Sequence, residues 1–195
     1  MSSPNQLKSS ANSPPPEDIQ RDMRNWLERA VIGLNLCPFA KAVYVKGQVR
    51  IQVSRAADAQ MVLQELAAEL QLLKGSDPAE HDTTLLVAPL CLQDFLEFND
   101  VVARGERLVR KLGFEGEIQL ASFHPQFQFA GTDPDDVSNY TNRAPYPTLH
   151  LLREASIDRA VAAFPDAAEI YEVNIEVLRR LGHAGWAQLD VGRKA

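Results

Sequence analysis

One short apolar run, Thr83 to Ala88, constrains the fold more than any other part of the sequence. Its residues do not alternate between apolar and polar, and such a run is typical of a β-strand that is covered on both faces. The run stands between two segments with helical periodicity, Asp58 to Lys74 and Leu92 to Leu112, each followed by a glycine that favours helix termination. This arrangement predicts an α/β sandwich with the run as a central strand.

Three further segments are rich in β-forming residues and are expected strands: Val49 to Val53, Glu117 to Phe123 and Thr148 to Arg153. Val43 to Val45 is expected either to form a hairpin with the first of them or to be its irregular beginning. The last segment could also be a helix starting at Pro147, but the prolines before it favour extended geometry. Strands and helices alternate along the chain, which predicts right-handed parallel crossovers and a mostly parallel sheet of four or five strands, flanked by helices.

Helices are expected at both ends of a single domain. An N-terminal helix begins at Pro16, where a proline and two acidic residues suit the first turn. A C-terminal helical pair follows the fourth strand, and its last helix begins with a capping box made by Asp166 and Glu169. Residues 1–15 are rich in Ser, Asn and Pro and are expected to be a disordered tail, which leaves residues 16–195 as one α/β domain.

Charge and composition narrow the classes of function. The chain has 195 residues and a formal net charge of −6, which argues against sequence-independent binding of nucleic acid. No run approaches the eighteen or so apolar residues of a membrane span, and no secretory signal is apparent. Cys37 and Cys91 are too few for a disulfide scaffold and are expected to be free thiols. These features predict a cytoplasmic protein with neither nucleic acid nor membrane as a partner.

The stretch from Phe123 to Glu154 has almost no helical periodicity. A long loop inside a compact domain is typical either of a binding or active-site loop or of disorder. Disorder fits poorly here, because aromatic side chains are costly to leave in water and several prolines reduce the entropy lost on ordering. We therefore expect an ordered loop, which is either functional or structural.

Strand polarity indicates where a site would lie. In open α/β sheets, ligands bind outside the carboxyl ends of the strands. The third strand ends at His124. If the fourth strand runs antiparallel to the third, it begins at the same edge and brings Asn142, Arg143 and His150 near His124.

The residue types at this edge suit an anion site. Arg143 offers a planar group of five donors for a carboxylate or a phosphate, beside the amide of Asn142. Arg143 could instead hold the loop together through backbone carbonyls or aspartates. His124 and His150 could act as acid and base near neutral pH or form structural hydrogen bonds. Their spacing matches no metal motif, so we predict no metal ligands.

Two other residues enter the candidate site with weaker support. Arg153 lies inside an apolar strand, where an unpaired charge is costly, so it should have a partner such as Glu154, an aspartate or an anionic ligand. Cys37 lies at the expected end of the first helix, where the helix dipole raises the pKa of a thiol. A buried packing role is therefore the default for Cys37.

Several stretches resemble a bacterial family of uncharacterised proteins, a domain of unknown function numbered fourteen-fifteen. They are Leu36 to Ala40, Phe123 to Pro125, Thr141 to Pro147 and Leu149 to Glu154. The similarity covers about residues 20 to 190. It implies a set of hallmark residues but no reaction, since the family has no established activity. The hallmark residues are Cys37, His124, Asn142, Arg143, His150 and Arg153.

The preferred hypothesis is an enzyme that acts on a small anionic metabolite. Asn142 and Arg143, with Arg153 and Cys37, would contact the substrate, and His124 or His150 would move a proton. A second hypothesis is a non-catalytic module that binds a ligand or a protein, in which the polar loop residues are structural. A metal-dependent hydrolase or oxygenase is a third. No motif for a nucleotide cofactor is present, and the sequence indicates neither a cofactor nor an oligomeric state.

Overall fold

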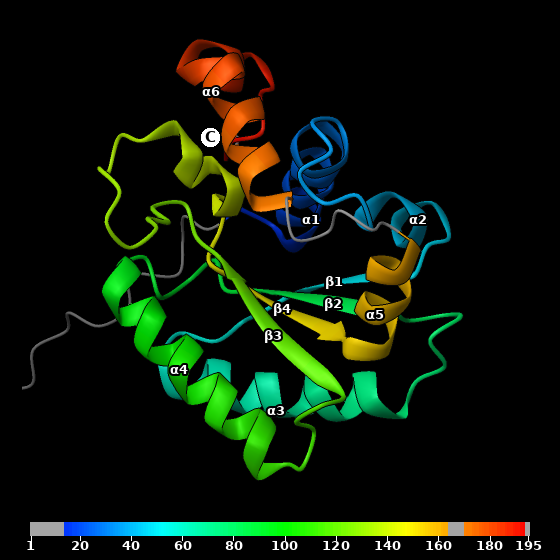
Figure 1. The fold of residues 1–195 in the computed structure, drawn as a ribbon. Helices are drawn as coiled ribbons and strands as arrows, with labels where there is room; N and C mark the ends of the chain where they lie inside the picture. The colour runs from blue at the N-terminus through cyan, green and yellow to red at the C-terminus, as the bar shows by residue number, and fades with distance from the viewer. Residues whose placement is uncertain (1–13, 164–169, 194–195) are drawn as a thin grey trace, which may run out of the picture.

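Four strands form one open sheet in the computed structural model, which describes residues 14–163 and 170–193 (Figure 1). The spatial order is β1-β2-β4-β3. β1 is parallel to β2, whereas β4 is antiparallel to both of its neighbours. The strands are β1 (Val49–Val53), β2 (Thr83–Val87), β3 (Ile118–Phe123) and β4 (Thr148–Arg153).

The predicted mostly parallel sheet is wrong, because two of the three strand pairings are antiparallel. β1, β2 and β3 do run in one direction, as the helical crossovers between them require. β4 changes the pairing, because it is inserted between β2 and β3. The loop of residues 124–147 returns the chain to the edge where β3 ends, so that Thr148 pairs with Phe123 and β4 runs antiparallel to β3.

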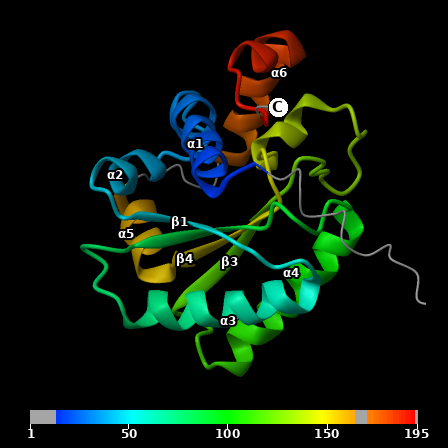
Figure 2. The same ribbon diagram turned by 180° about the vertical axis from the view of Figure 1, so that it is seen from behind.

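Two helices cover one face of the sheet, α3 (Ala59–Gly75) and α4 (Phe95–Lys111). The other face is covered by α1 (Pro16–Trp26), which continues into the π-helical turn η1 (Leu27–Ile32), and by α2 (Ala40–Val45) and α5 (Glu154–Ala163). Figures 1 and 2 show these two layers from opposite sides. α6 (Ile170–Gln188) packs against the 3-10 turn η2 (Val137–Asn142) of the long loop.

The central strand and the helix caps follow local sequence rules. Every residue of β2 is buried, as its unbroken apolar pattern predicts. The carboxylate of Asp58 caps α3 by accepting from Met61 N at 2.8 Å. The carboxylate of Asp94 caps α4, which therefore begins at Phe95 rather than at Leu92.

Some local predictions differ from the structure. Val43–Val45 belong to the short helix α2 and not to a strand. α6 continues to Gln188, although Gly182 inside it has φ 64 and ψ 176, which is not a helical conformation. The capping box of Asp166 and Glu169 and most of the predicted tail lie outside the described residues.

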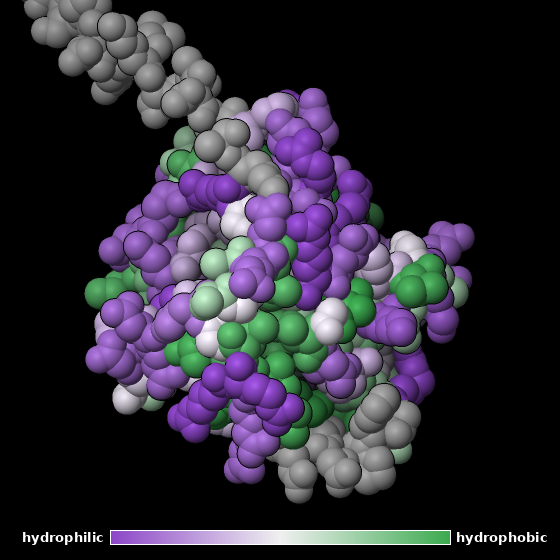
Figure 3. Space-filling model, turned by 90° about the horizontal axis from the view of Figure 1, so that it is seen from above, coloured by the Kyte–Doolittle hydropathy of each residue, from purple (hydrophilic) through white to green (hydrophobic). Residues whose placement is uncertain are grey.

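Nothing in the described part of the chain forms a helix with the length and apolar character needed to cross a membrane. Seen from above, apolar side chains gather near the middle of the surface and hydrophilic side chains surround them (Figure 3). The exposed large apolar side chains of α6 are Tyr171 and Val173.

Candidate functional site

The loop of residues 124–147 is held in shape by its own polar contacts. Asn139 is fully buried, and its Oδ1 accepts from Phe129 N at 3.0 Å while its Nδ2 donates to Asp133 O at 2.9 Å. Asp136 caps η2 by accepting from Ser138 N at 2.8 Å. The loop is therefore an ordered part of the fold. Asn139 was not among the residues predicted from the sequence, although buried Asn commonly organises loops through its paired donor and acceptor.

His124 is buried beneath this loop and has structural partners on both ring nitrogens. Gln126 N donates to Nδ1 at 3.0 Å, so the ring proton lies on Nε2, which is 3.0 Å from Leu92 O. The rings of Phe95 and Phe98 lie 5.3 and 5.1 Å from the imidazole. Burial lowers the pKa of His124, which favours a neutral ring. This geometry joins the loop to the start of α4.

Asn142 and Arg143 lie at the predicted edge of the sheet. Asn142 Nδ2 donates to Ser122 O at 3.2 Å, and Asn142 O accepts from His124 N at 3.1 Å. Arg143 donates from Nε to Phe127 O at 3.1 Å and from Nη2 to Pro134 O at 2.7 Å. Both residues thus stabilise the loop, and these contacts leave part of the Arg143 guanidinium available to another acceptor.

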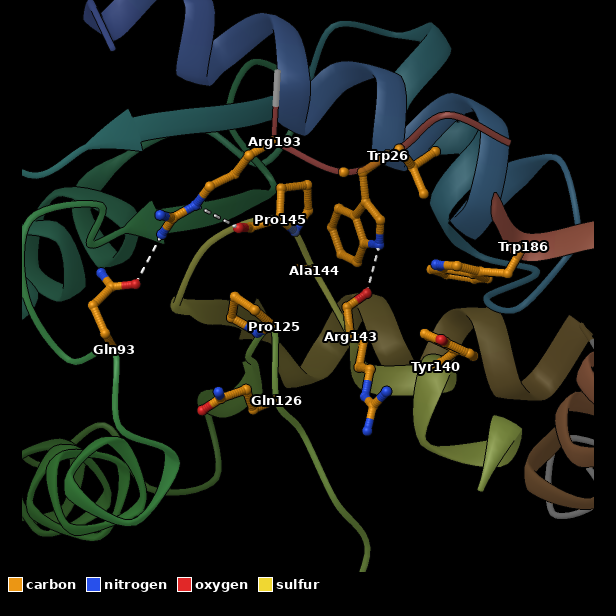
Figure 4. Close-up of a pocket in the computed structure, with 12 residues that line it drawn as sticks. Trp26, Gln93, Pro125, Gln126, Tyr140, Arg143, Ala144, Pro145, Trp186 and Arg193 are labelled. Atoms are coloured by element: carbon orange, nitrogen blue, oxygen red, sulfur yellow. Dashed lines mark hydrogen bonds between the residues drawn. The ribbon is translucent and has the colours of Figure 1, made fainter. Parts of the chain in front are cut away.

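Arg143 also lines a cleft of about 440 Å³, which we call the arginine cleft (Figure 4). The cleft is built from the ends of the long loop, from α1, from the connection between β2 and α4, and from α6 with the segment after it. Figure 4 shows Arg143 and Arg193 at different sides of it, with prolines between them. Its lining residues are Trp26, Gln93, Pro125, Gln126, Tyr140, Arg143, Ala144, Pro145, Trp186, Val191, Gly192 and Arg193.

Aromatic side chains form one wall of the arginine cleft. Tyr140 and Trp186 stack with their ring centroids 4.6 Å apart and an interplanar angle of 15°. The guanidinium of Arg143 lies 4.9 Å from the centre of the Tyr140 ring. Trp26 Nε1 donates to Arg143 O at 3.0 Å, and the Tyr140 hydroxyl lies 3.2 Å from Nδ1 of His183.

Arg193 is held at the opposite side by neutral groups. Its Nε donates to Pro145 O at 3.2 Å and its Nη2 to Gln93 Oε1 at 2.9 Å. Its guanidinium lies 4.6 Å from the centre of the Tyr146 ring, whose hydroxyl donates to the buried carboxylate of Asp22 at 2.9 Å. Burial and this carboxylate raise the pKa of Tyr146, which therefore stays protonated.

The remaining predicted residues lie around a second cavity of about 670 Å³, on the face of the sheet covered by α1, α2 and α5. We call it the sheet cavity. His150 and Cys37 line it, and burial lowers the pKa of His150 to about 4 and raises the pKa of Cys37. Arg153 also borders it, but its guanidinium binds the C-terminal end of α3, with Nη2 2.8 Å from Ser76 O.

The six predicted site residues are therefore divided in the structure. Arg143 lines the arginine cleft, with Asn142 next to it in the chain, whereas Cys37, His150 and Arg153 border the sheet cavity. His124 is among the lining residues of neither. Within residues 14–163 and 170–193, no three His, Cys, Asp or Glu side chains are grouped so that they could hold a metal ion.

Four residues of the arginine cleft were not predicted from the sequence: Trp26, Tyr140, Trp186 and Arg193. Trp26 and Trp186 belong to helices, where an aromatic residue indicates only a packed face. Arg193 lies in a short polar segment with no motif around it. No local pattern could have identified these residues, because only the tertiary fold brings them together.

Comparison with known proteins identifies a family to which the chain is similar. The model of a family described as "Protein of unknown function (DUF1415)" matches residues 18–188. No curated protein and no solved structure matches the chain.

Proposed function

The chain belongs to the DUF1415 family, whose function is unknown, and we propose from the geometry that it binds a small organic anion, a carboxylate or a phosphate ester, in the arginine cleft. The observation that carries this proposal is the pair of arginines. Arg143 and Arg193 come from distant parts of the chain and line one cleft. Guanidinium groups suit carboxylate and phosphate because their donors form a planar fork.

The charge balance of the cleft supports the proposal. The protein has 26 acidic and 20 basic residues, so carboxylates are plentiful. In the part of the chain that the structure describes, however, no carboxylate forms a salt bridge with Arg143 or Arg193. Both guanidinium groups are held instead by carbonyls, an amide and aromatic rings. A bound anion would supply the missing negative charge.

The shape of the cleft indicates the kind of anion. Pro125, Ala144 and Pro145 form an apolar surface between the two arginines. A ligand that reaches both guanidinium groups must therefore extend across this surface. We infer an organic anion with an apolar middle, and either two acidic groups or one acidic group and a polar end that Gln93 or Gln126 can bind.

The geometry supports binding more directly than catalysis. Proton transfer needs an acid or base within hydrogen-bonding reach of the ligand. Both ring nitrogens of His124 already have hydrogen-bond partners beneath the loop, and His150 borders the other cavity. Of the histidines, His183 is the one beside the arginine cleft, through its contact with the Tyr140 hydroxyl. If turnover is found, Tyr140 and His183 are the side chains that we would assign to proton transfer.

Titration calorimetry with a panel of anions tests the proposal. The panel contains phosphate, pyrophosphate, acetate, succinate, benzoate and phthalate. We expect the larger organic anions to bind more tightly than phosphate or acetate. Arg193→Gln should weaken binding about ten-fold or more, because a hydrogen bond to a charged group contributes roughly 1.5–3 kcal/mol.

Arg104→Gln is the matched control, because Arg104 is exposed on α4 and binds only the side chain of Gln60 among the described residues. Arg143→Gln should also weaken binding, with melting curves recorded to detect any loss of loop structure. Binding should also weaken as NaCl is raised, since the attraction is between charges. An equal effect of the Arg104 and Arg193 substitutions, or no binding of any anion, would contradict the proposal.

A further inference from the structure

We propose that the sheet cavity is a second ligand site, which takes a neutral, mainly hydrocarbon molecule with one hydrogen-bond donor, such as a hydroxyl group, that binds Nδ1 of His150. The cavity is separate in its chemistry from the arginine cleft, although Trp26 lines both. The proposal does not depend on the function proposed above.

The size and walls of the cavity fit such a molecule. All four strands contribute to its floor, through Val49, Leu85, Phe123 and Leu152 among others. Side chains of α1, η1, α2 and α5 form its sides. A volume of about 670 Å³ lies within the range of about 300–1,000 Å³ typical of small-molecule sites, which are mostly apolar with a few polar groups.

The hydrogen bonds of His150 fix which of its nitrogens can bind a ligand. The Thr83 hydroxyl donates its single proton to Leu151 O at 2.7 Å. Its oxygen, 2.8 Å from His150 Nε2, must therefore accept a proton from that nitrogen. This assigns the proton to Nε2 and leaves a lone pair on Nδ1. Among the residues that the structure describes, Nδ1 has no hydrogen-bond partner.

The charge around His150 favours a neutral ligand. Burial keeps the imidazole and the Cys37 thiol uncharged at neutral pH, since it lowers the pKa of His150 and raises the pKa of Cys37. Asp82 accepts the Ser156 hydroxyl at 2.6 Å, and the Arg153 guanidinium is turned to α3.

The two other charged side chains that line the cavity, Lys46 and Arg159, are exposed to solvent. An anionic head would have to give up its water beside His150 without an ion-pair partner there. A hydroxyl group, by contrast, can donate to Nδ1.

The donor role can be tested with two molecules of the same formula, octan-1-ol and 1-methoxyheptane, with octanoate as the charged comparison. Calorimetry should show that octan-1-ol binds about five-fold more tightly than 1-methoxyheptane, since one neutral hydrogen bond to a buried acceptor gives roughly this factor. Octanoate should bind more weakly than octan-1-ol. His150→Phe retains an aromatic ring and removes the acceptor, so the alcohol and the ether should then bind equally.

Ala121→Phe tests the location, because Ala121 lines the cavity and pairs with His150 across β3 and β4. The larger side chain should fill the cavity and abolish binding of all three molecules. The matched control is Ala68→Phe, an exposed position on α3 at the other face of the sheet. Circular dichroism should show folded protein for each variant.

Three results would each overturn the proposal. The first is no binding of octan-1-ol by the unchanged protein. The second is equal affinity for octan-1-ol and 1-methoxyheptane, which would remove the role of His150. The third is binding that persists in folded Ala121→Phe, which would place the ligand elsewhere.

Discussion

Replacing Asn139 with alanine tests whether the long loop is built around one buried amide. The substitution removes the acceptor for Phe129 N and the donor to Asp133 O, whose bonds measure 3.0 and 2.9 Å. The Thr132 hydroxyl, 2.9 Å from Asn139 Oδ1, also loses this acceptor but can still donate to Phe129 O at 2.9 Å. The substitution leaves a backbone N–H that the compact loop cannot expose without rearrangement. The two lost bonds to the backbone and one unpaired donor should lower the free energy of unfolding by roughly 2–4 kcal/mol.

For a chain of this length, each 1 kcal/mol lowers the melting temperature by about 2–4 °C, so Asn139→Ala should melt about 5–15 °C lower. Thermal unfolding followed by circular dichroism measures this shift. Asn99→Ala, at an exposed position of α4, is the matched control and should melt within about 2 °C of the unchanged protein.

The same variant should also lose anion binding. Tyr140 directly follows Asn139, and Arg143 lies four residues after it. Both line the arginine cleft, and a rearranged loop would displace them. A loss of less than about 1 kcal/mol, or full stability together with full binding, would refute the idea that this amide organises the loop.

Two further predictions concern stability. Burial lowers the pKa of His150 to about 4, so the folded state binds fewer protons than the unfolded state below pH 6.5. The free energy of unfolding should therefore fall by roughly 3 kcal/mol as the pH drops from 6.5 to 4. Urea unfolding should show a shallower pH dependence of stability for His150→Phe, and an identical pH dependence would refute this cause. Asp94→Ala removes the cap of α4 and should lower the free energy of unfolding in urea by about 1 kcal/mol. Asp100→Ala, at an exposed position of the same helix, should lower it by less than about 0.5 kcal/mol, and equal losses would contradict the capping role.

The sequence predicted elements well where a local rule was sufficient. The unbroken apolar pattern of Thr83 to Ala88 identified the buried strand, and the prolines before Thr148 identified the beginning of β4. The prediction of β-structure for Val43–Val45 was wrong because β-propensity depends on context. These residues belong to a short helix without a single buried side chain. The order of strands in the sheet has no local signature, so the insertion of β4 between β2 and β3 could not be foreseen.

The candidate site was predictable to the same extent. Strand polarity predicted that Asn142 and Arg143 lie at the edge where β3 ends. The pairing of Phe123 with Thr148 confirms that β4 begins at this edge. The hydrogen bonds of His124 could not be predicted, because one partner, Leu92 O, belongs to the connection between β2 and α4, which is distant in the sequence. Arg193 likewise joins the cleft only through the path of the C-terminal segment.

The insertion of β4 also sets the order in which the sheet can be completed. β2 and β3 are not neighbours, so when residues up to 123 have left the ribosome both strands still present unpaired edges where β4 will lie. Such edges are templates for aggregation until they are paired. The native sheet therefore cannot be completed until Thr148–Arg153 emerge, and its completion depends on contacts between distant parts of the chain, which form slowly.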